Sequence, residues 1–437
     1  MILKLPRSGP AAPALFSLVL LGAGYTVSAA QPETDPVVEH DLSATSSLQV
    51  TELAEPVVAP NLDLKEVAPL PQPVPASEPE ASISDPAFPE EAPGTDTATE
   101  DNDHEDKLVL LGSEVAAGTA TRLAWATAGT ISGLDTPTPV MVIKGKKPGK
   151  TMCMTAAVHG DELNGIEIVR RVMYDIEPKN LTGNIIGVPI VNLQGFQRGS
   201  RYLSDRRDLN RFFPGEADGS LASRIAHSLF NEIIVHCDFL VDMHTGSLRR
   251  TNMPQIRADI RDEDIADLTE GFGKVVVIHS TGSPGMLRFA ATAHGITAVT
   301  LEVGESLRIQ EDQIDIGVSS INRLLEHQGM YSRLFTWGEP EPIYYKSRWL
   351  RAERGGILFS KKKQGDMVSI DEVLGTITDP ITNETSDVLS TANGRIIGMA
   401  VDQFVMPGYG IYHVGIEASE KVLAEQEPTA DSEIDVE

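Results

Sequence analysis

The segment Ala156-Ala157-Val158-His159-Gly160-Asp161-Glu162 follows the apolar run 151–155 and precedes a second apolar run, 166–174. Two such runs, separated by a polar turn that contains a glycine, predict a strand, a turn and a helix. His159 and Glu162 stand three residues apart where the strand ends, and imidazole nitrogens and carboxylate oxygens are ordinary zinc ligands. The segment therefore predicts part of a metal site at the end of a strand.

A second apolar strand, 238–243, ends at His244 and repeats this arrangement. Three ligands of His, Glu and His type leave a fourth position for water, as in a catalytic rather than a structural zinc site. A third apolar strand, 298–301, ends at Glu302, whose carboxylate is the candidate general base. Ligands of an open α/β sheet bind beyond the carboxyl ends of its strands, so we expect these strand-end side chains to meet in one crevice.

The first thirty residues have the pattern of a secretory signal peptide. Lys4 and Arg7 precede the apolar run 14–21, and small residues at 28–30 offer a cleavage site. An uncleaved membrane anchor is the alternative, although the apolar run is short for a membrane span. We therefore expect an exported protein, periplasmic or extracellular, that is tethered to the membrane only if residues 1–30 are retained.

Acidic segments lie on both sides of the expected folded region. Residues 31–106 hold nineteen acidic residues against one lysine, and twelve prolines, which predicts a disordered linker. Residues 417–437 are also acidic and are predicted to be a disordered tail. Most of the net charge of −27 comes from these two segments, so the folded part is nearly neutral. No basic stripe stands out, which argues against a nucleic-acid partner.

Between residues 107 and 340, helical periods alternate with apolar strands. This alternation predicts an α/β domain with a mostly parallel or mixed sheet and helices on both faces. Residues 247–257, which include several arginines, are expected to form a loop. From 341 to 416 the chain has short apolar runs separated by Gly and Pro turns, which predict a small all-β barrel.

The loop 199–215 is dense in charged residues and includes Asp208-Leu209-Asn210-Arg211. A charge run is usually a solvated face. Here an aromatic pair and Pro-Gly follow at once, and such residues fix the conformation of a loop. A fixed arginine can hold a carboxylate through two parallel hydrogen bonds, so both interpretations stay open.

The two cysteines, Cys153 and Cys237, lie in or beside predicted strands. In an exported protein they could form a disulfide. A cysteine in a strand is more often a small apolar core residue, and sequence cannot test the geometry that a bridge requires, so no disulfide is predicted and the pairing stays open.

Residues 107–416 resemble the succinylglutamate desuccinylase and aspartoacylase family of the zinc carboxypeptidase superfamily. Four motifs carry the resemblance: His159-Gly160-Asp161-Glu162, Asp208-Leu209-Asn210-Arg211, Asp242-Met243-His244-Thr245-Gly246 and Leu301-Glu302-Val303-Gly304.

The resemblance implies roles for several residues of these motifs and for one arginine outside them. One zinc ion per chain would be held by His159, Glu162 and His244, with Glu302 as general base and acid. The substrate carboxylate would be bound by Asn210 and Arg211. The scissile carbonyl would be polarised by Arg201, or by Arg206 or Arg207 in its place.

The expected function is zinc-dependent hydrolysis of the amide bond of N-acyl amino acids or related amides that bear a carboxylate. The partner is then a small molecule or a short peptide. Named members of the family act in the cytosol, whereas this chain begins with an apparent export signal. The alternative is therefore an exported zinc carboxypeptidase-type peptidase that cleaves peptides or glutamyl and isopeptide bonds. A non-catalytic binding protein on the same fold is a third reading, which the complete set of ligands and base argues against.

Overall fold

The computed structural model describes residues 107–126, 136–331, 343–401 and 404–424. The predicted signal peptide and acidic linker lie outside the described residues. Across the described part of the chain, no helix has both the length and the apolar character needed to cross a bilayer.

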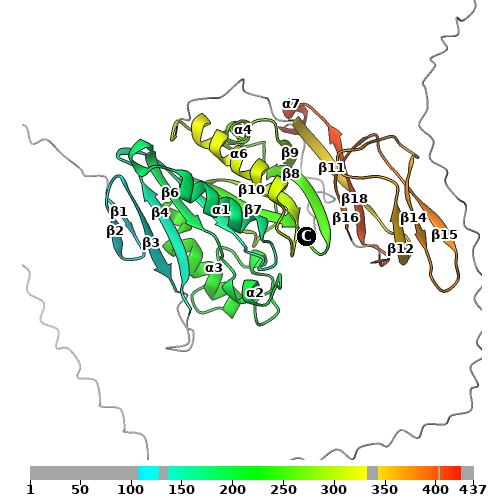
Figure 1. Cartoon of the computed structure of the whole chain (residues 1–437), viewed down its shortest axis with the longest axis horizontal. Helices are drawn as coiled ribbons and strands as arrows, with labels where there is room; N and C mark the ends of the chain where they lie inside the picture. The colour runs from blue at the N-terminus through cyan, green and yellow to red at the C-terminus, as the bar shows by residue number, and fades with distance from the viewer. Residues whose placement is uncertain (1–106, 127–135, 332–342, 402–403, 425–437) are drawn as a thin grey trace, which may run out of the picture. The chain divides into compact units, whose positions relative to one another are not determined.

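A mixed sheet of twelve strands organises the fold, in the order β13-β16-β18-β11-β9-β8-β10-β7-β5-β6-β4-β3 (Figure 1). Its strands before residue 332 are β3 (Thr119–Trp125), β4 (Thr138–Lys144), β5 (Lys147–Ala156), β6 (Thr182–Val188), β7 (Phe239–Gly246), β8 (Arg250–Ala258), β9 (Val276–His279) and β10 (Thr297–Glu305). At its centre β5, β6, β7 and β10 are parallel, whereas β8 is antiparallel to β10. The predicted mixed α/β fold is confirmed.

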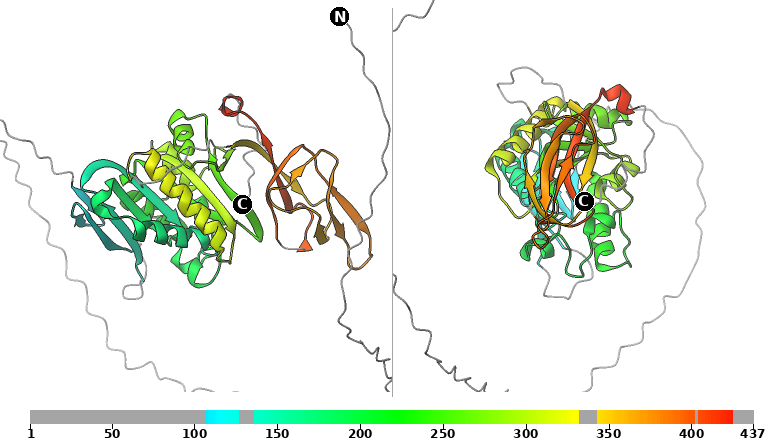
Figure 2. Two further views of the ribbon diagram at one scale, coloured as in Figure 1. Left: turned by 45° about the horizontal axis from the view of Figure 1, so that its top comes forward. Right: turned by 90° about the vertical axis from the view of Figure 1, so that its right-hand side faces the viewer.

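Helices cover both faces of this sheet (Figures 1 and 2). One face packs against α1 (Asn164–Asp175), α4 (Glu263–Glu270) and α6 (Glu311–His327), and the other packs against α3 (Leu221–Glu232) and α5 (Leu287–Ala293). Alternate residues of β10 enter the two cores, Leu301 on the α1 side and Ala298 on the α3 side. Because both faces are buried, the strands are apolar along most of their length.

Smaller elements complete the first part of the chain. They are the paired strands β1 (Leu108–Leu110) and β2 (Ser113–Val115), the short helix α2 (Leu193–Gln197), and the 3-10 turns η2 (Pro178–Asn180), η3 (Leu209–Arg211) and η4 (Ile234–His236).

The C-terminal strands continue the sheet instead of forming a barrel of their own. β11 (Ile343–Arg351) pairs with β9, and β16 (Gly394–Ala400) pairs with both β8 and β18 (Gly410–Glu417). With β11 paired to β18, the strands β8, β9, β11, β18 and β16 close a five-stranded ring. The expected barrel made only of residues 341–416 is therefore wrong in its membership, because two strands of the ring come from the α/β part. Pairing of edges that are distant in sequence leaves no local pattern.

The remaining C-terminal strands lie outside the ring. A four-stranded sheet has the order β15-β14-β12-β17, with β12 (Gly356–Ser360), β14 (Val373–Thr378), β15 (Thr385–Leu389) and β17 (Phe404–Val405). The short strand β13 (Met367–Val368) extends the large sheet beyond β16. Part of the predicted tail is also structured: α7 (Glu420–Ala424) follows β18, and its Leu423 is buried in the α1-side core. Residues 425–437 lie outside the described residues.

The expected loop 247–257 is wrong, because most of it is the strand β8. The register of β8 with β10 shifts between Asn252 and Gln255, so that three steps along β8 match two along β10. This bulge contains Met253 and Pro254. A proline cannot donate to a sheet ladder, and a bulge is one of the few places where a strand accepts it.

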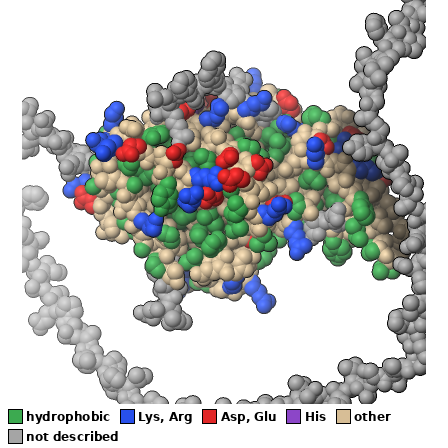
Figure 3. Space-filling view, viewed as in Figure 1, with side chains coloured by type: hydrophobic (Ala, Val, Ile, Leu, Met, Phe, Trp, Pro, Cys, Tyr) green, Lys and Arg blue, Asp and Glu red, His purple; other side chains and the backbone are tan. Residues whose placement is uncertain are grey.

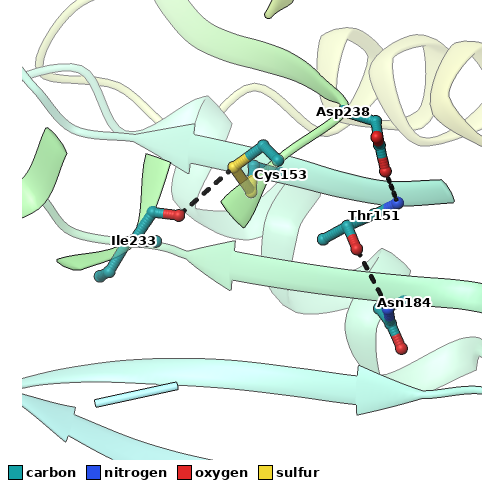
Figure 4. Close-up of a disulfide and its surroundings, with 6 residues drawn as sticks. Thr151, Cys153, Asn184, Ile233 and Asp238 are labelled. Atoms are coloured by element: carbon teal, nitrogen blue, oxygen red, sulfur yellow. Dashed lines mark hydrogen bonds between the residues drawn. A yellow bond between two sulfur atoms is a disulfide. The ribbon is translucent and has the colours of Figure 1, made fainter. Parts of the chain in front are cut away.

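Cys153 and Cys237 form a disulfide, with Cα atoms 5.7 Å apart (Figure 4). Cys153 lies in β5, and Cys237 lies two residues before β7. The two strands pair in parallel, with Met152 opposite Phe239. The neighbouring Thr151 N–H donates to the Asp238 carboxylate at 2.6 Å and fixes the start of β7 beside β5. The pairing that the sequence left open is therefore settled by the structure. The sequence shows that each lies near a strand, but not that the two strands are neighbours.

Candidate active site

The loop that carries His159 and Glu162 lies between β5 and α1. Ala157 has a positive φ of 48°, which turns the chain sharply after the strand. Gly160 packs against the backbone of residues 195 and 196 so closely that a Cβ atom would lie 2.1 Å from it. Only glycine fits there, and this contact holds the His159–Glu162 turn against α2.

His159, Glu162 and His244 come together as predicted and form a group that could hold a metal ion. His159 Nδ1 lies 2.8 Å from Glu162 Oε1, and His244 Nδ1 lies 2.9 Å from Glu162 Oε2. The two Nδ1 atoms are 3.1 Å apart. All three side chains are at least 98 % buried.

This group fits zinc in both chemistry and spacing. Zinc binds His nitrogens and carboxylate oxygens at about 2.0–2.2 Å, and ligands at tetrahedral positions then lie roughly 3.3 Å apart. The observed separations are slightly shorter, so a small outward movement of each ligand atom would admit the ion. Among the described residues, this is the only such His, Cys, Asp or Glu group.

A carboxylate holds the far side of each imidazole. His244 Nε2 lies 2.8 Å from Asp242 Oδ2, and Asp242 Oδ1 accepts a hydrogen bond from the Thr155 hydroxyl at 2.6 Å. His159 Nε2 lies 3.2 Å from Asp208 Oδ1. Contacts of this kind fix the orientation of a ligating histidine and leave its other nitrogen to face the metal.

The charged neighbours of this group shift the pKa values of its side chains in the direction opposite to burial. Burial lowers the pKa of His244, but the Asp242 and Glu162 carboxylates outweigh it and raise that pKa well above its ordinary value. Burial raises the pKa of Glu162, yet His159 and His244 bring it well below the ordinary range. Glu162 is therefore ionised at neutral pH, as a metal ligand must be, and metal binding would release protons from the imidazoles.

Arg201, the first of the three arginines predicted to polarise the substrate carbonyl, lies beside the group. Its guanidinium Nη1 is 3.2 Å from His159 Nδ1 and donates to the Ser247 hydroxyl at 2.7 Å, while Nη2 donates to Asp208 Oδ2 at 2.9 Å. The side chain is 3 % exposed. Arg206 and Arg207 are exposed, and Arg207 pairs with Asp205. Of the three, the structure brings only Arg201 to the group.

Asn210 and Arg211 lie in η3, directly after Asp208, in the same loop as Arg201. The Asn210 side chain is buried and its Oδ1 accepts from the Leu287 N–H at 2.8 Å, which joins the loop to α5. Arg211 is partly exposed and donates to the Asn210 carbonyl at 2.9 Å. Asn210 therefore serves the packing of the loop in this structure.

Glu302 lies next to His244 across the sheet, because the parallel register of β10 and β7 pairs these two residues. Its carboxylate is fully buried. Oε2 accepts from Asn252 Nδ2 at 3.1 Å, and Oε1 lies 3.4 Å from Arg257 Nε. Both partners come from β8, so a strand that the sequence did not predict holds the candidate base.

Several residues of the site were missed by the sequence reasoning. Asp208 and Asp242 hold the two histidines, Ser247 contacts Arg201, and Asn252 and Arg257 contact Glu302. Asp242 had a usable signal, because residues two apart in a strand lie on one face and it precedes His244 by two.

The fold and site define a mixed α/β protein with a His-Glu-His metal-type centre at the carboxyl ends of its strands. Residues 148–328 match the succinylglutamate desuccinylase/aspartoacylase catalytic domain. The resemblance to this family is therefore confirmed over the part of the chain that holds the centre.

A curated relative is the N-alpha-acetyl-L-2,4-diaminobutyric acid deacetylase of Halomonas elongata. It is 25 % identical over 253 residues, which are 55 % of this chain and 74 % of the relative. Two solved structures share the fold. The succinylglutamate desuccinylase/aspartoacylase of Rhodobacter sphaeroides has a TM-score of 0.62 at 22 % identity and covers 70 % of this chain and 98 % of its own. The product-bound ectoine utilization protein EutE (DoeB) of Ruegeria pomeroyi has a TM-score of 0.62 at 21 % identity, with 68 % and 95 % covered.

Proposed function

We propose that this protein is a zinc-dependent amide hydrolase that removes the acyl group from N-acyl amino acids or related amides bearing a carboxylate. The observation that carries the proposal is the His159–Glu162–His244 group, whose imidazoles are each held by a carboxylate. The family match and the deacetylase relative support amide hydrolysis as the use of that group.

In this proposal His159, Glu162 and His244 hold the zinc ion. When bound, zinc supplies Lewis acidity toward a carbonyl oxygen and lowers the pKa of water to about 7. Glu302 takes the proton of the attacking water and passes it to the leaving nitrogen. Arg201 donates to the oxygen on which negative charge develops. Arg211, with Asn210 holding its loop, binds the substrate carboxylate.

Export is part of the proposal. The Cys153–Cys237 disulfide supports an oxidising compartment, because such bonds form and persist outside the cytosol. Together with the signal-like pattern of residues 1–30 it favours the periplasm or the extracellular space. Substrates are then expected outside the cytoplasm, where short peptides are an alternative to N-acyl amino acids as the substrate.

The test combines metal content with amine release. The full chain is purified with zinc supplied, and its zinc content is compared with that of His244→Ala and of His236→Ala, a control on an exposed histidine. We expect one zinc per chain in wild type and control, and loss of zinc in His244→Ala. Amine release is measured on a panel of N-acyl amino acids and γ-glutamyl peptides.

The outcomes separate the candidate functions. Release from N-acyl amino acids that disappears in His244→Ala supports a deacylase. Release from peptides alone would make the protein a peptidase. A wild type that binds no zinc would overturn the hydrolase proposal and leave a binding protein.

A further inference from the structure

The bulge in β8 gives Glu302 two polar neighbours on one face of the sheet. Glu302 pairs with His244 on one side and with Gln255 on the other, so these three side chains lie in one row. The register shift then returns Asn252 to the same face, as its hydrogen bond to Glu302 shows. A bulge beside an active site commonly redirects a side chain in this way.

The Gln255 amide is fully buried, and neither Oε1 nor Nε2 has a hydrogen-bond partner among the described residues. Asn252 is 4 % exposed, and its Oδ1 also lacks a partner there, although its Nδ2 is used by Glu302. Native proteins leave few buried polar atoms unpaired, and each such atom requires a partner from outside the chain or a reason.

Mostly apolar side chains occupy the space on the side of Gln255 away from Glu302. Gln255 pairs with Val276 of β9, and Val276 packs with Ile278, Tyr345, Ile397 and Met253 in one cluster. Tyr345 alone in this cluster carries a hydroxyl, and it does not form a hydrogen bond with the Gln255 amide. Because this side offers the amide no partner, we expect the partner to come from the side that faces Glu302.

We propose that Gln255 and Asn252 recognise the leaving amine of the substrate, and that this part carries a second N–H donor group, either an amine or a carboxamide. The inference rests on the proposed function. Glu302 hands its proton to the leaving nitrogen, so the leaving amine lies toward Glu302 and, beyond it, toward β8. Two acceptor oxygens and one donor nitrogen are offered there, which suits a ligand rich in N–H groups.

The sheet geometry sets the length of this ligand. Neighbouring strands lie about 4.8 Å apart, so Gln255, two strands from His244, is roughly 10 Å from the metal group at the level of the backbone. A side chain of a few carbons that ends in a donor spans the remaining distance from the scissile nitrogen. Ornithine and glutamine have such side chains, whereas norvaline has the same carbon backbone without the donor.

The experiment uses the full chain with zinc supplied, as wild type, Gln255→Met and Gln328→Met. Gln328 is a partly exposed glutamine at the end of α6, bonded to Lys150, and serves as the matched control. KM is measured for the Nα-acetyl derivatives of ornithine, glutamine and norvaline, and the shift of Tm is measured with the three free amino acids.

In wild type and Gln328→Met we expect a KM about 10- to 100-fold lower for a donor-bearing substrate than for the norvaline derivative, because the latter leaves buried acceptors unpaired. Gln255→Met should bring the KM values together and remove the extra Tm shift, while its ligand-free Tm equals or exceeds that of wild type. Preference for ornithine identifies an ammonium donor, and preference for glutamine identifies an amide.

Equal KM values and equal Tm shifts in wild type would overturn the inference. So would a Gln255→Met protein that keeps the preference but has a lower Tm, which would assign Gln255 to an enclosed structural water. If no acetyl derivative is hydrolysed while free ornithine or glutamine still raises Tm through Gln255, the proposed hydrolysis fails and the recognition of the amine stands.

Discussion

Asp242 Oδ2 lies 2.8 Å from His244 Nε2, and the two residues stand two apart in β7, on one face of the sheet. A buried carboxylate thereby holds the one candidate ligand that is distant in sequence from the other two. Asp242 is held in turn by Thr155 of the neighbouring strand β5. The orientation of His244 is thus set before a metal arrives.

Asp242→Asn should weaken zinc binding by about 10- to 100-fold, the usual effect of removing a carboxylate behind a ligating histidine. Zinc affinity is measured by competition with a chelating dye. Asp238→Asn is the control, because it changes an aspartate that lies just before the same strand and bonds Thr151 instead of a histidine. An unchanged affinity in Asp242→Asn would remove Asp242 from the metal site.

Glu302→Gln should keep its zinc and lose turnover by about 100-fold or more, because an amide cannot accept the proton of water. The change keeps the size of the side chain, and zinc content with kcat on the best substrate of the panel gives the comparison. Loss of zinc together with activity would instead place Glu302 among the ligands. Retained kcat would assign the proton transfer to another group.

The disulfide should contribute about 2–5 kcal/mol to the free energy of unfolding, because it closes a long loop in the unfolded chain. The pair Cys153→Ala and Cys237→Ala is compared with the oxidised wild type by denaturant unfolding, with wild type in reductant as a second arm. A free energy of unfolding that does not respond to reductant or to the substitutions would show that the packing of β5 against β7 alone supplies the stability.

The ion-pair cluster between α1 and α6 predicts a pH effect away from the site. Acidic and basic side chains lie side by side on the face that carries these helices (Figure 3). Hydrogen bonds from Arg170, and then from Arg171, lower the pKa of Glu167 to about 2, although burial opposes them. Arg171 also pairs with Glu311 and Asp315 of α6 and so joins the two helices.

Because the folded pKa of Glu167 is depressed, its stabilisation is present above the unfolded pKa of about 4.5 and is lost as pH falls toward 2. Glu167→Gln should lower the free energy of unfolding by about 0.5–1 kcal/mol at pH 7. The difference should be smaller at high salt, because salt screens exposed ion pairs. The difference from wild type should shrink as pH falls from 5 to 2. A difference that is constant across this range would contradict the electrostatic origin.

The sequence predicted that His159, Glu162 and His244 lie close together because they stand near local signals, an apolar strand followed by a polar residue and a glycine. The position of Glu302 beside them was predicted in the same way. β8 was missed because Arg250, Thr251 and Asn252 give no apolar alternation and Pro254 argues against a strand. The bulge that accommodates Pro254 exists only in relation to β10, so no local pattern could reveal it.

The other differences between prediction and structure come from contacts between residues that are distant in sequence. The closed ring requires β8 to pair with β16 and β9 with β11, across more than sixty residues in each case. The disulfide requires β5 and β7 to be neighbours. The role of Asp208 beside His159 depends on the folding of a loop forty-nine residues further along the chain.

The ring of five strands ties the two halves of the chain together through main-chain hydrogen bonds. A protein shortened at residue 340 would leave one side of β9 and part of β8 without strand partners, and such open edges invite aggregation. It would also loosen the strand from which Asn252 and Arg257 reach Glu302. The C-terminal strands are therefore part of the scaffold of the centre, and exchanging them with those of a relative would require matching strand edges as well as surface contacts.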